Sequence, residues 1–341
     1  MGALLKAAHG CAHGVRWKSS VQMFEINKLL WVCNLKHQIE NGTYKSKGFK
    51  RFDIMERGKL RHIQSVHISE RTVQKTLVNN VIKPVVLPRL ILDNTASQKG
   101  KGTDFALKRL REHLRWHYAR YGTEGGILTM DFHDYFGSID HGRAIEMINR
   151  YIDDPKLQHY VHYFIDIFDG DKGLGLGSEI SQVVAIFFPN CIDRLVKEDF
   201  SIHCYGRYND DSYVISNSLE LLEEIDQSIT ELAGLIGIEV NPKKTKITPF
   251  ANGNEFAFLK KRIYFSPTGK IVMQVSQKNI RARRQTIRMQ REEYDAGRMP
   301  ASSIWQSYQS WRGYAKKYND SHIVHEMDCY FAKVMKGVDF K

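Results

Sequence analysis

Two adjacent aspartates, at the end of the run Tyr-Asn-Asp-Asp over residues 208–211, constrain the fold of this chain more than any other feature. Runs at 202–207 and 212–216 predict strands on either side, and therefore a β-hairpin with Asp210 and Asp211 at its tip. Carboxylates held that close raise each other's pKa and destabilise the fold unless a cation lies between them, and Mg²⁺ suits ligands that are all oxygen. Taken alone, the run favours an ordinary turn, because Asn and Asp prefer turns for conformational reasons.

The charge of the chain indicates a polyanionic partner. Among 341 residues, 50 Lys and Arg stand against 38 Asp and Glu, which gives a formal net charge of +12. Clustered cations bind phosphate backbones by releasing counterions, so nucleic acid is the first partner class to consider. With 42% hydrophobic residues, the chain is also long and apolar enough for a large globular core.

Most of the excess charge lies in one C-terminal segment. Residues 256–318 contain 14 Lys and Arg but only 3 Asp and Glu. A solvated helix face normally alternates charges of both signs, so this segment predicts a helical unit that grips a nucleic-acid strand. The residues predicted to bind it are Arg281, Arg283, Arg284 and Arg288. The aromatic residues interleaved with them, which can pack or stack, are Trp305, Tyr308, Trp311 and Tyr314.

A second basic region precedes a helical pattern. Lys99 and Lys101 lie in a Gly-containing loop at 98–104, whose last residues, Thr103 and Asp104, predict a helix N-cap. An apolar stripe at helical spacing follows over 107–121. One interpretation places this loop and helix against a nucleic-acid backbone, and the other is an ordinary solvated helix; the pattern favours neither.

The cysteines and the hydropathy pattern limit the compartment. The 5 cysteines are scattered without CxxC spacing, which indicates neither a disulfide framework nor a cysteine zinc site and fits a reducing setting. No stretch approaches the roughly 18 apolar residues of a membrane span, and the N-terminal residues lack the apolar run of a signal peptide. We therefore expect a soluble, cytoplasmic protein.

A third aspartate completes a plausible metal-binding set. Asp131 directly follows the apolar run 127–130, which predicts a buried strand with an acid at its end. Nucleotidyl transfer uses two divalent ions about 4 Å apart, held by carboxylates from neighbouring strands. Asp131, together with Asp210 and Asp211, supplies such a set, whereas Asp134 is a weaker candidate and Asp140 belongs to the following turn.

The order of the predicted elements is a strand, several helices, a β-hairpin, a helix and further strands, which is typical of an α+β fold. The predicted helices lie at 21–40, 71–82, 107–121, 141–151, 155–168, 178–199 and 219–236. The predicted strands lie at 59–67, 127–130, 202–207, 212–216, 238–240, 244–248 and 256–265.

Six runs, in order along the chain, resemble sequence motifs of reverse transcriptases. They are 59–74 for the fingers, 131–141 for motif A, 176–182 for motif B, 208–211 for the YxDD box, 241–247 for motif D and 258–260 for the primer grip. The resemblance covers about residues 55 to 265, and more loosely 310–314 resembles the thumb of bacterial members.

The resemblance implies a right-hand polymerase with an antiparallel-sheet palm. Its parts would be N-terminal helices and fingers at 1–125, palm at 126–265 and a basic helical thumb at 266–341. It implies RNA-directed DNA synthesis from dNTPs with two Mg²⁺ ions, for which Mn²⁺ can substitute. No RNase H, endonuclease or integrase module is expected after the thumb. The expected partners are a structured non-coding RNA as template or primer, the cDNA product, and an accessory protein or a further copy of the chain.

The resemblance also assigns roles at the metal site. Asp131 and Asp210 would bridge the two ions, Asp211 would assist, and the carbonyl of Phe132 would complete the shell of the second ion. Phe136 would lie under the sugar, where its ring leaves no space for a 2′-hydroxyl and so favours dNTPs. Simple core packing is the alternative for Phe136.

The other residues assigned to the substrate are Lys59, Arg61, Gly177, Gln182 and Lys244. The cations at 59 and 61 would hold the triphosphate. Gly177 would let the backbone approach the nucleotide, beside the motif B residue Gln182. Lys244 would protonate or neutralise the leaving pyrophosphate, unless it is only a surface lysine.

Motif B departs from the common pattern. Leu-Gly at 176–177 and Ser-Gln at 181–182 stand where retroviral and group II intron enzymes carry Gln-Gly and a later Ser-Pro. This combination resembles the enzymes of diversity-generating retroelements and of antiphage defence in bacteria and phages, and loss of a polar side chain at Leu176 predicts relaxed fidelity. Two alternatives remain: an RNA-dependent RNA polymerase, against which Phe136 argues, and a catalytically silent polymerase-fold protein that binds nucleic acid.

Overall fold

The computed structural model describes residues 1–56, 59–175, 177–318 and 320–340, without the side chains of Glu56, Lys59 and Arg61. Its centre is a four-stranded antiparallel sheet in the order β5-β6-β3-β8, which confirms the predicted α+β class. The strands are β3 (Gly126–Met130), β5 (Tyr205–Tyr208), β6 (Asp211–Ser216) and β8 (Lys246–Pro249). A two-stranded pair, β4 (Phe132–His133) with β7 (Glu239–Val240), adjoins it.

The central sheet has an apolar layer on each face, because successive side chains of a strand point to opposite sides. Ile127 and Tyr213 belong to the core under one helix, α6, whereas Leu128 and Val214 belong to the main core with α12. These helices are α6 (Thr103–Tyr121) and α12 (Leu219–Leu235). Helix α6 differs from its predicted start, since Gly102 and not Thr103 or Asp104 holds the N-cap position.

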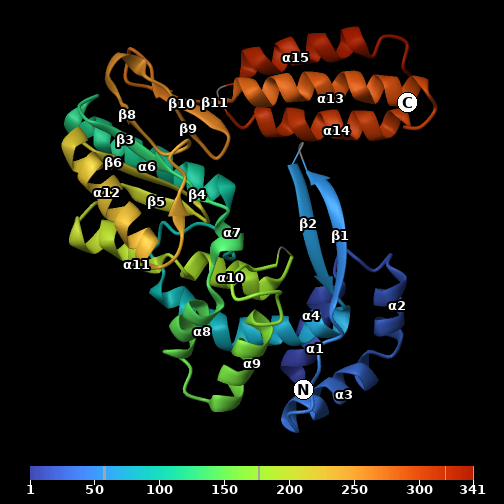
Figure 1. Cartoon of the computed structure of the whole chain (residues 1–341). Coiled ribbons are helices and arrows are strands. Elements are labelled where there is room, and N and C mark those ends of the chain that lie inside the picture. Colours follow the sequence, from blue (N-terminus) through green and yellow to red (C-terminus); the bar gives the residue numbers. More distant parts are fainter. Residues whose placement is uncertain (57–58, 176, 319, 341) are drawn as a thin grey trace.

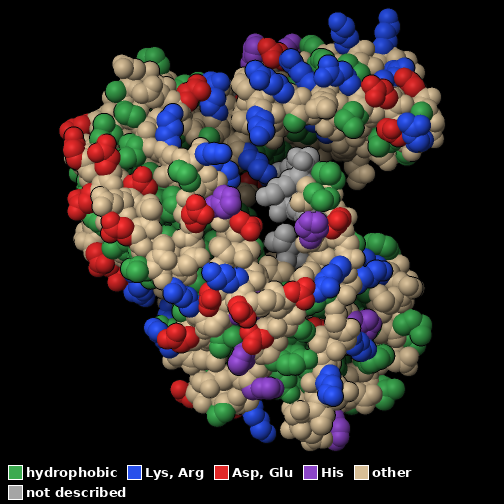
Figure 2. All heavy atoms as spheres, in the orientation of Figure 1, with side chains coloured by type: hydrophobic (Ala, Val, Ile, Leu, Met, Phe, Trp, Pro, Cys, Tyr) green, Lys and Arg blue, Asp and Glu red, His purple; other side chains and the backbone are tan. Residues whose placement is uncertain are grey.

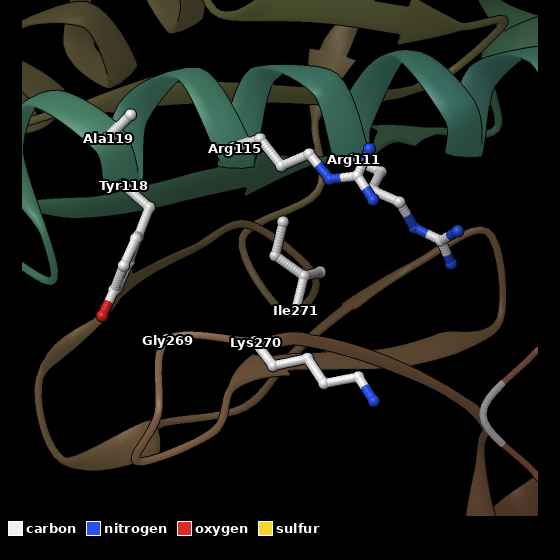
Figure 3. A pocket seen from close by; sticks show the side chains of 7 residues that line it. All are labelled: Arg111, Arg115, Tyr118, Ala119, Gly269, Lys270 and Ile271. Atoms are coloured by element: carbon white, nitrogen blue, oxygen red, sulfur yellow. The ribbon is translucent and has the colours of Figure 1, made fainter.

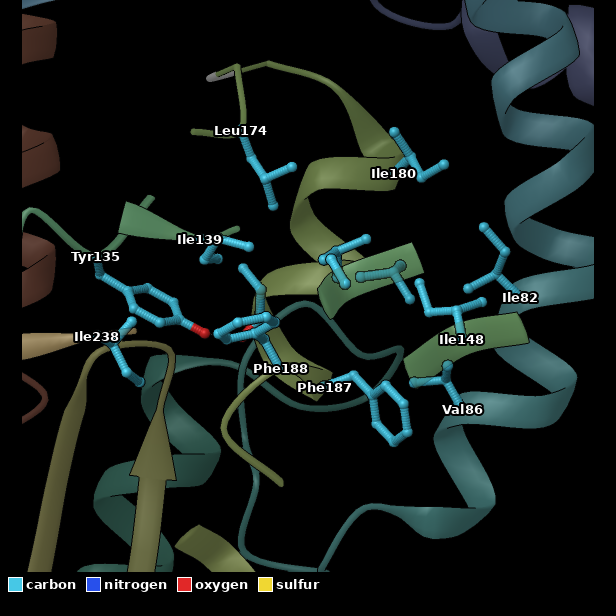
Figure 4. Packing of buried hydrophobic residues seen from close by; sticks show 14 of the residues in the cluster. Ile82, Val86, Tyr135, Ile139, Ile148, Leu174, Ile180, Phe187, Phe188 and Ile238 are labelled. Carbon is cyan, nitrogen blue, oxygen red and sulfur yellow. The ribbon is translucent and has the colours of Figure 1, made fainter. Parts of the chain in front are cut away.

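The main core lies between the sheet and the helices that separate β3 from β5 (Figure 4). A single helix predicted over 178–199 is divided there, because Pro189 lacks the amide hydrogen that a continuous helix needs. The elements are α7 (Tyr135–Ser138), α8 (His141–Asn149), α9 (Pro155–Ile165), α10 (Glu179–Phe187), α11 (Asn190–Arg194) and η3 (Leu195–Asp199).

The N-terminal part contains an antiparallel ribbon, β1 paired with β2, that rises from a group of helices. The helix predicted over 21–40 is divided at Asn27, and the helix predicted from 71 begins earlier because the ring of His67 accepts the backbone amide of Ser69. The elements are α1 (Gly2–Ala12), α2 (Ser19–Ile26), α3 (Lys28–Glu40), β1 (Phe49–Glu56), β2 (Lys59–Val66), α4 (Ile68–Leu77), η1 (Val78–Ile82), α5 (Lys83–Val86) and η2 (Leu87–Arg89).

A three-stranded antiparallel sheet follows the central one. The single strand predicted over 256–265 is interrupted, because Leu259 and Lys260 adopt positive φ angles of 46° and 65° and turn the chain back. The elements are η4 (Ala251–Gly253), β9 (Phe256–Phe258), β10 (Lys261–Phe265) and β11 (Ile271–Val275).

The C-terminal part is a bundle of helices with its own core. Tyr308 is buried there, and its ring stacks on that of Phe331 with centroids 4.0 Å apart. At least this member of the predicted aromatic set therefore packs inside the bundle. The helices are α13 (Gln277–Asp295), α14 (Ala301–Ala315) and α15 (Ser321–Val334).

The parts surround a hollow. Figure 1 shows the central sheet on the left, the C-terminal bundle at the top, and the β1–β2 ribbon standing between the bundle and the N-terminal helices. In Figure 2 a hollow opens between these parts, and Lys and Arg side chains gather on the bundle above it. None of the helices in the described part of the chain combines the length and apolar character that crossing a membrane requires.

Candidate active site

The pairing of β3 with β6 brings two of the predicted aspartates together. Met130 lies opposite Ser212 in this antiparallel ladder. Asp131, the residue after β3, therefore lies at the end of the sheet where Asp211 begins β6. Asp131 is buried, with 6% of its surface exposed, and Asp211 is half-buried. Residues 80 positions apart in the sequence thus meet at one end of the sheet.

The hairpin tip holds the third aspartate. Tyr208 pairs with Asp211 across β5 and β6, so Asn209 and Asp210 form the connecting turn. Asn209 adopts a positive φ of 54°, a conformation that Asn tolerates better than most residues. The hairpin predicted from the sequence is therefore present, with its acids at the tip.

A buried arginine anchors this tip. The guanidinium of Arg207 is 0% exposed and donates two hydrogen bonds, of 2.7 and 2.6 Å, to the equally buried carboxylate of Asp193 in α11. Burial by itself would lower the pKa of Arg207, but the charge of Asp193 outweighs it and holds that pKa above its ordinary value. Arg207 also donates to the backbone oxygen of Asn209 at 3.0 Å, which fastens the turn to the core.

This anchor was missed in the sequence analysis. Its signal was a lone arginine next to the acidic run, inside a strand that is otherwise apolar, and such a residue needs a buried acid as partner. The backbone of Arg207 is also hydrogen-bonded to a loop far upstream. The amide of Arg207 donates to the backbone oxygen of Asp93 at 3.0 Å, and the amide of Thr95 donates to the backbone oxygen of Arg207 at 2.9 Å.

The acidic end of the sheet carries unbalanced negative charge. Burial first, and then the charges of Asp210 and Asp131, together raise the pKa of Asp211 to about 7, against smaller opposing effects of Lys244 and Lys260. Burial, together with the charges of Asp210 and Asp211, also raises the pKa of Tyr208. Such a cluster attracts a cation.

Lys244 supplies part of the positive charge that such an acidic cluster attracts. Its ammonium nitrogen donates to both carboxylate oxygens of Asp131, at 2.7 and 2.9 Å, and this contact raises the pKa of Lys244. Asn241, in the same loop between β7 and β8, donates from its backbone amide to the backbone oxygen of Asp131 at 2.8 Å. The motif D loop is therefore attached to the end of β3.

The aspartates do not form a ready-made metal cage. In the ranges that the structure describes, no group of three His, Cys, Asp or Glu side chains is gathered closely enough to hold an ion. Two facts nevertheless fit a hard divalent cation: the donors are carboxylate oxygens, and the charges of Asp210 and Asp131 add to burial in raising the pKa of Asp211.

The residues predicted to contact the nucleotide lie on separate elements. Phe136 is half-buried in α7, and its ring meets that of Tyr135 edge-on, with centroids 5.7 Å apart. Gly177 has a φ of +107°, which a side chain would strain, and Gln182 is exposed on α10. Leu176 and the side chains of Lys59 and Arg61 lie outside the described residues.

Contacts between α4 and α10 position the motif B loop, and sequence reasoning missed them. The hydroxyl of Ser178 donates to the side-chain oxygen of Gln74 at 3.1 Å, and Lys75 forms an ion pair with Glu179. These contacts join the loop that carries Gly177 to the helix behind the ribbon.

The predicted nucleic-acid-binding cations differ in their surroundings. Lys99 is exposed, whereas Lys101 donates to the backbone oxygens of Leu92 and Asn94 at 2.8 and 2.9 Å and so fastens its own loop. On α13, Arg281 and Arg288 are exposed.

Two further arginines of α13 make contacts within the bundle. Arg283 is turned inwards, donates to Ser307 at 3.0 Å and lies over the ring of Tyr308, and burial lowers its pKa. Arg284 lies 3.8 Å from Glu326. Of the four, Arg281 and Arg288 are exposed, whereas Arg283 and Arg284 are half-buried.

Comparisons with known proteins agree with this geometry. The family model described as "Reverse transcriptase (RNA-dependent DNA polymerase)" matches residues 45–284, more than two thirds of the chain. Among solved structures, the chain is similar to telomerase from Candida albicans in complex with a fragment of telomeric RNA, with a TM-score of 0.51 and 9% identity. The match covers 77% of this chain and 55% of the telomerase chain, and at that identity it shows the fold alone. No curated protein sequence matches significantly.

Proposed function

The chain belongs to the reverse transcriptase family of RNA-directed DNA polymerases, and on that premise we propose that Asp131, Asp210 and Asp211 are its catalytic carboxylates. The observation that carries the proposal is the register of β3 and β6: β3 ends and β6 begins at the same end of the sheet, with Asp131 beside Asp211. The turn between β5 and β6 adds Asp210 at that end.

The proposed cofactor is a pair of Mg²⁺ ions, for which Mn²⁺ can substitute. Asp131 and Asp210 would hold both ions, with Asp211 and the backbone oxygen of Phe132 completing the ligand set, and these hard oxygen donors suit either cation. When bound, the ions activate the primer hydroxyl and neutralise the charge that develops on the leaving pyrophosphate.

The remaining residues would select and position the nucleotide. The ring of Phe136 fills the space of a 2′-hydroxyl, Gly177 allows close approach of the backbone, and Gln182 faces the substrate from α10. Lys59 and Arg61, on the ribbon, would bind the triphosphate. Lys244 can move from Asp131 to the pyrophosphate, because its side chain remains 61% exposed.

The division into N-terminal helices and fingers at 1–125, palm at 126–265 and basic helical thumb at 266–341 is part of the same proposal. The thumb would grip the template–product duplex through exposed cations such as Arg281 and Arg288, with Arg284 at its edge, and Lys99 would contact the strand from the loop before α6. The inward contacts of Arg283 and Lys101 favour structural roles for these two.

The template would be a structured non-coding RNA, copied in a diversity-generating retroelement or an antiphage defence system of a bacterium or phage. A similar protein, telomerase, binds an RNA fragment in its solved structure, which supports an RNA partner. An accessory protein or a second copy of the chain would assist. Sequencing the nucleic acid that copurifies with the protein tests this context, because it reports template, product and priming site together.

Primer extension on an RNA template tests the catalytic assignment. We expect dNTPs but not NTPs to support synthesis, chelation of divalent ions to abolish it, and Asp131→Asn or Asp211→Asn to lower its rate by at least about 100-fold. Asp153→Asn, at an exposed acid outside the site, is the matched control. Undiminished synthesis by Asp131→Asn would overturn the proposal.

A further inference from the structure

A cavity of about 340 Å³ lies between helix α6 and the turn that joins β10 to β11. Three of its lining residues are cations: Arg111 and Arg115 from α6, and Lys270 from the turn. Figure 3 shows the two arginines along the helix and Lys270 across the opening, with the charged ends of Arg111 and Lys270 extending to the same side. The other lining residues are Tyr118, Ala119, Gly269 and Ile271. We call this feature the α6 cavity.

Two of the three cations of the α6 cavity, Arg115 and Lys270, are not paired with acids as Arg109 of the same helix is, whereas Arg111 donates to the sulfur of Met273 at 3.5 Å. Arg109, two residues before Arg111 on α6, pairs with Asp93 and Glu112, both at 2.6 Å. By contrast, Arg115 and Lys270 form no ion pair with any carboxylate of the described ranges, and none of the described lining residues is acidic. Clustered cations without acidic partners repel one another and favour an anionic ligand.

The wall of the α6 cavity is held in place before any ligand arrives. Gly269 has a φ of +76°, and a Cβ added there would lie 2.1 Å from the ring of Tyr118, so only glycine lets the turn sit on this ring. Within the turn, Ser266 accepts the backbone amides of Gly269 at 2.8 Å and of Lys270 at 3.0 Å. A preformed site loses little conformational entropy on binding.

The α6 cavity is separate from the candidate active site. Lys260, in the turn between β9 and β10, lies near enough to the candidate active site for its charge to lower the pKa of Asp211. Lys270 lies beyond the other end of β10, which spans the five residues Lys261–Phe265. At about 3.3 Å per residue, the strand places these two turns roughly 16 Å apart.

We propose that the α6 cavity binds backbone phosphates of an RNA strand that runs over the α6 side of the central sheet, outside the hollow proposed to hold the template–product duplex. Arg111 and Arg115 offer guanidinium forks that match phosphate oxygens, and Lys270 adds a point charge from the opposite wall. The inference rests on the proposed function in two respects, namely that the strand is RNA and that the duplex lies in the hollow. A free phosphate or nucleotide offers the same chemistry, and the test separates these sources.

Binding measurements on the full chain test the inference. The variants are Arg115→Glu with Lys270→Glu, and a control of equal charge change at two exposed lysines far from the cavity, Lys6→Glu with Lys156→Glu. The probes are an RNA–DNA hybrid of about 12 base pairs and the same hybrid with a single-stranded RNA extension of about 40 nucleotides, each titrated at several salt concentrations. The binding assay needs neither nucleotide nor metal. A protein that binds the probes but does not extend a primer would therefore count against the proposed function and leave this inference to be decided by the binding data.

We expect the cavity variant to bind the extended probe about tenfold or more weakly than the control variant does, with the salt slope reduced by about one to two and affinity for the bare hybrid unchanged. Equal affinities of both variants for the extended probe would overturn the inference. So would an equal loss for the bare hybrid, which would mean that the substitutions act on the hollow or on the fold. The neutral pair Arg115→Gln with Lys270→Gln should give a smaller loss at an unchanged Tm.

A competition experiment identifies the source of the phosphate. Photo-crosslinking of the extended probe should yield labelled peptides from 108–119 or 266–275, and unlabelled RNA should abolish this labelling. If inorganic phosphate or a free nucleoside triphosphate at about 1 mM removed the label as completely as RNA does, the cavity would serve a free anion, and the proposal of an RNA strand would be wrong.

Discussion

The ammonium nitrogen of Lys244 lies 2.7 Å from Oδ1 and 2.9 Å from Oδ2 of Asp131, so the carboxylate that we propose as a metal ligand is already paired with a cation. The Lys244 side chain remains 61% exposed, whereas that of Asp131 is 8% exposed. An ion pair with one partner so open to water contributes at most about 1 kcal/mol. A divalent ion can therefore displace Lys244 and leave it available to the departing pyrophosphate.

Removing this lysine should separate metal binding from turnover. We expect Lys244→Met to tighten Mg²⁺ binding to the nucleic-acid-free protein by up to about fivefold, because the competing cation is lost, and to slow single-turnover nucleotide addition. Isothermal titration calorimetry and rapid-quench kinetics measure the two effects. Lys243→Met, at the exposed neighbour, should change neither. Unaltered metal affinity in Lys244→Met would show that the pair does not compete with the ion.

Asp211 should make the metal-free protein less stable as the pH rises. Its pKa is raised from 3.8 to about 7, chiefly by burial, so the folded state binds more protons than the unfolded state between these values. Stability is therefore lost as the pH increases through this window. Asp211→Asn removes the effect, and its advantage over wild type should grow from pH 4 to pH 7 and then level off.

Urea unfolding in the presence of a chelator measures this difference. The direct comparison is between pH 5 and pH 8, with Asp153→Asn as the control at an acid outside the cluster. An advantage of Asp211→Asn that is the same at both pH values would contradict the linkage. Addition of Mg²⁺ should stabilise wild type more than the variant, because the ion binds the folded state alone.

Arg207 should matter for both stability and catalysis. Arg207→Met leaves the buried carboxylate of Asp193 without its partner, and we expect a loss of about 3–5 kcal/mol in the free energy of unfolding. Replacing both residues, with Arg207→Met and Asp193→Leu, should restore most of that stability, since no uncompensated charge remains. Denaturant titration of the single and double variants measures these changes.

The rate of nucleotide addition by the double variant tests whether Arg207 positions the turn that carries Asp210. It still lacks the donor to the backbone oxygen of Asn209, so nucleotide addition should stay slow although the fold is recovered. A double variant with full stability and a wild-type rate would reduce Arg207 to a purely structural role.

Lys261 should give the protein a second pH dependence, at alkaline values. Its ammonium group is buried and lies 3.6 and 3.3 Å from the ring centres of Tyr314 and Tyr318, and burial lowers its pKa to about 8 from 10.5. The unfolded state therefore binds more protons between these values, and this group makes stability rise with pH across that window.

A methionine of similar length removes that titration. We expect Lys261→Met to gain stability relative to wild type at pH 7, and this gain to shrink as the pH approaches 10. Thermal unfolding at pH 7, 8.5 and 10 measures it, with the exposed Lys278→Met as control. A gain that does not change with pH would mean that Lys261 is not the titrating group.

The local parts of the site were predictable from the sequence, and the long-range parts were not. The apolar run before Asp131 and the turn around Asp210 specify strand ends within a few residues, so the acids and the hairpin could be placed. The pairing of Arg207 with Asp193 joins elements 14 positions apart through a shared buried site, which no spacing rule indicates. The break at Leu259 was missed because leucine rarely adopts positive φ.

The predicted role of one basic loop shows the same limit. Lys101 was a candidate for contact with nucleic acid on charge alone, but its ammonium group binds backbone oxygens of its own loop. Composition reports how many cations a segment carries. Whether a cation binds nucleic acid or the protein itself depends on which backbone oxygens the fold leaves without an amide partner.

The full burial of the Arg207–Asp193 pair also bears on how the enzyme should respond to ionic strength. Salt weakens contacts between exposed cations and a phosphate backbone, but it does not reach a pair that is 0% exposed on both sides. Raising the salt concentration should therefore cause earlier release of the template, and so shorter products, while each addition proceeds at an unchanged rate. We therefore expect product length and the rate of the chemical step to depend on different parts of the molecule.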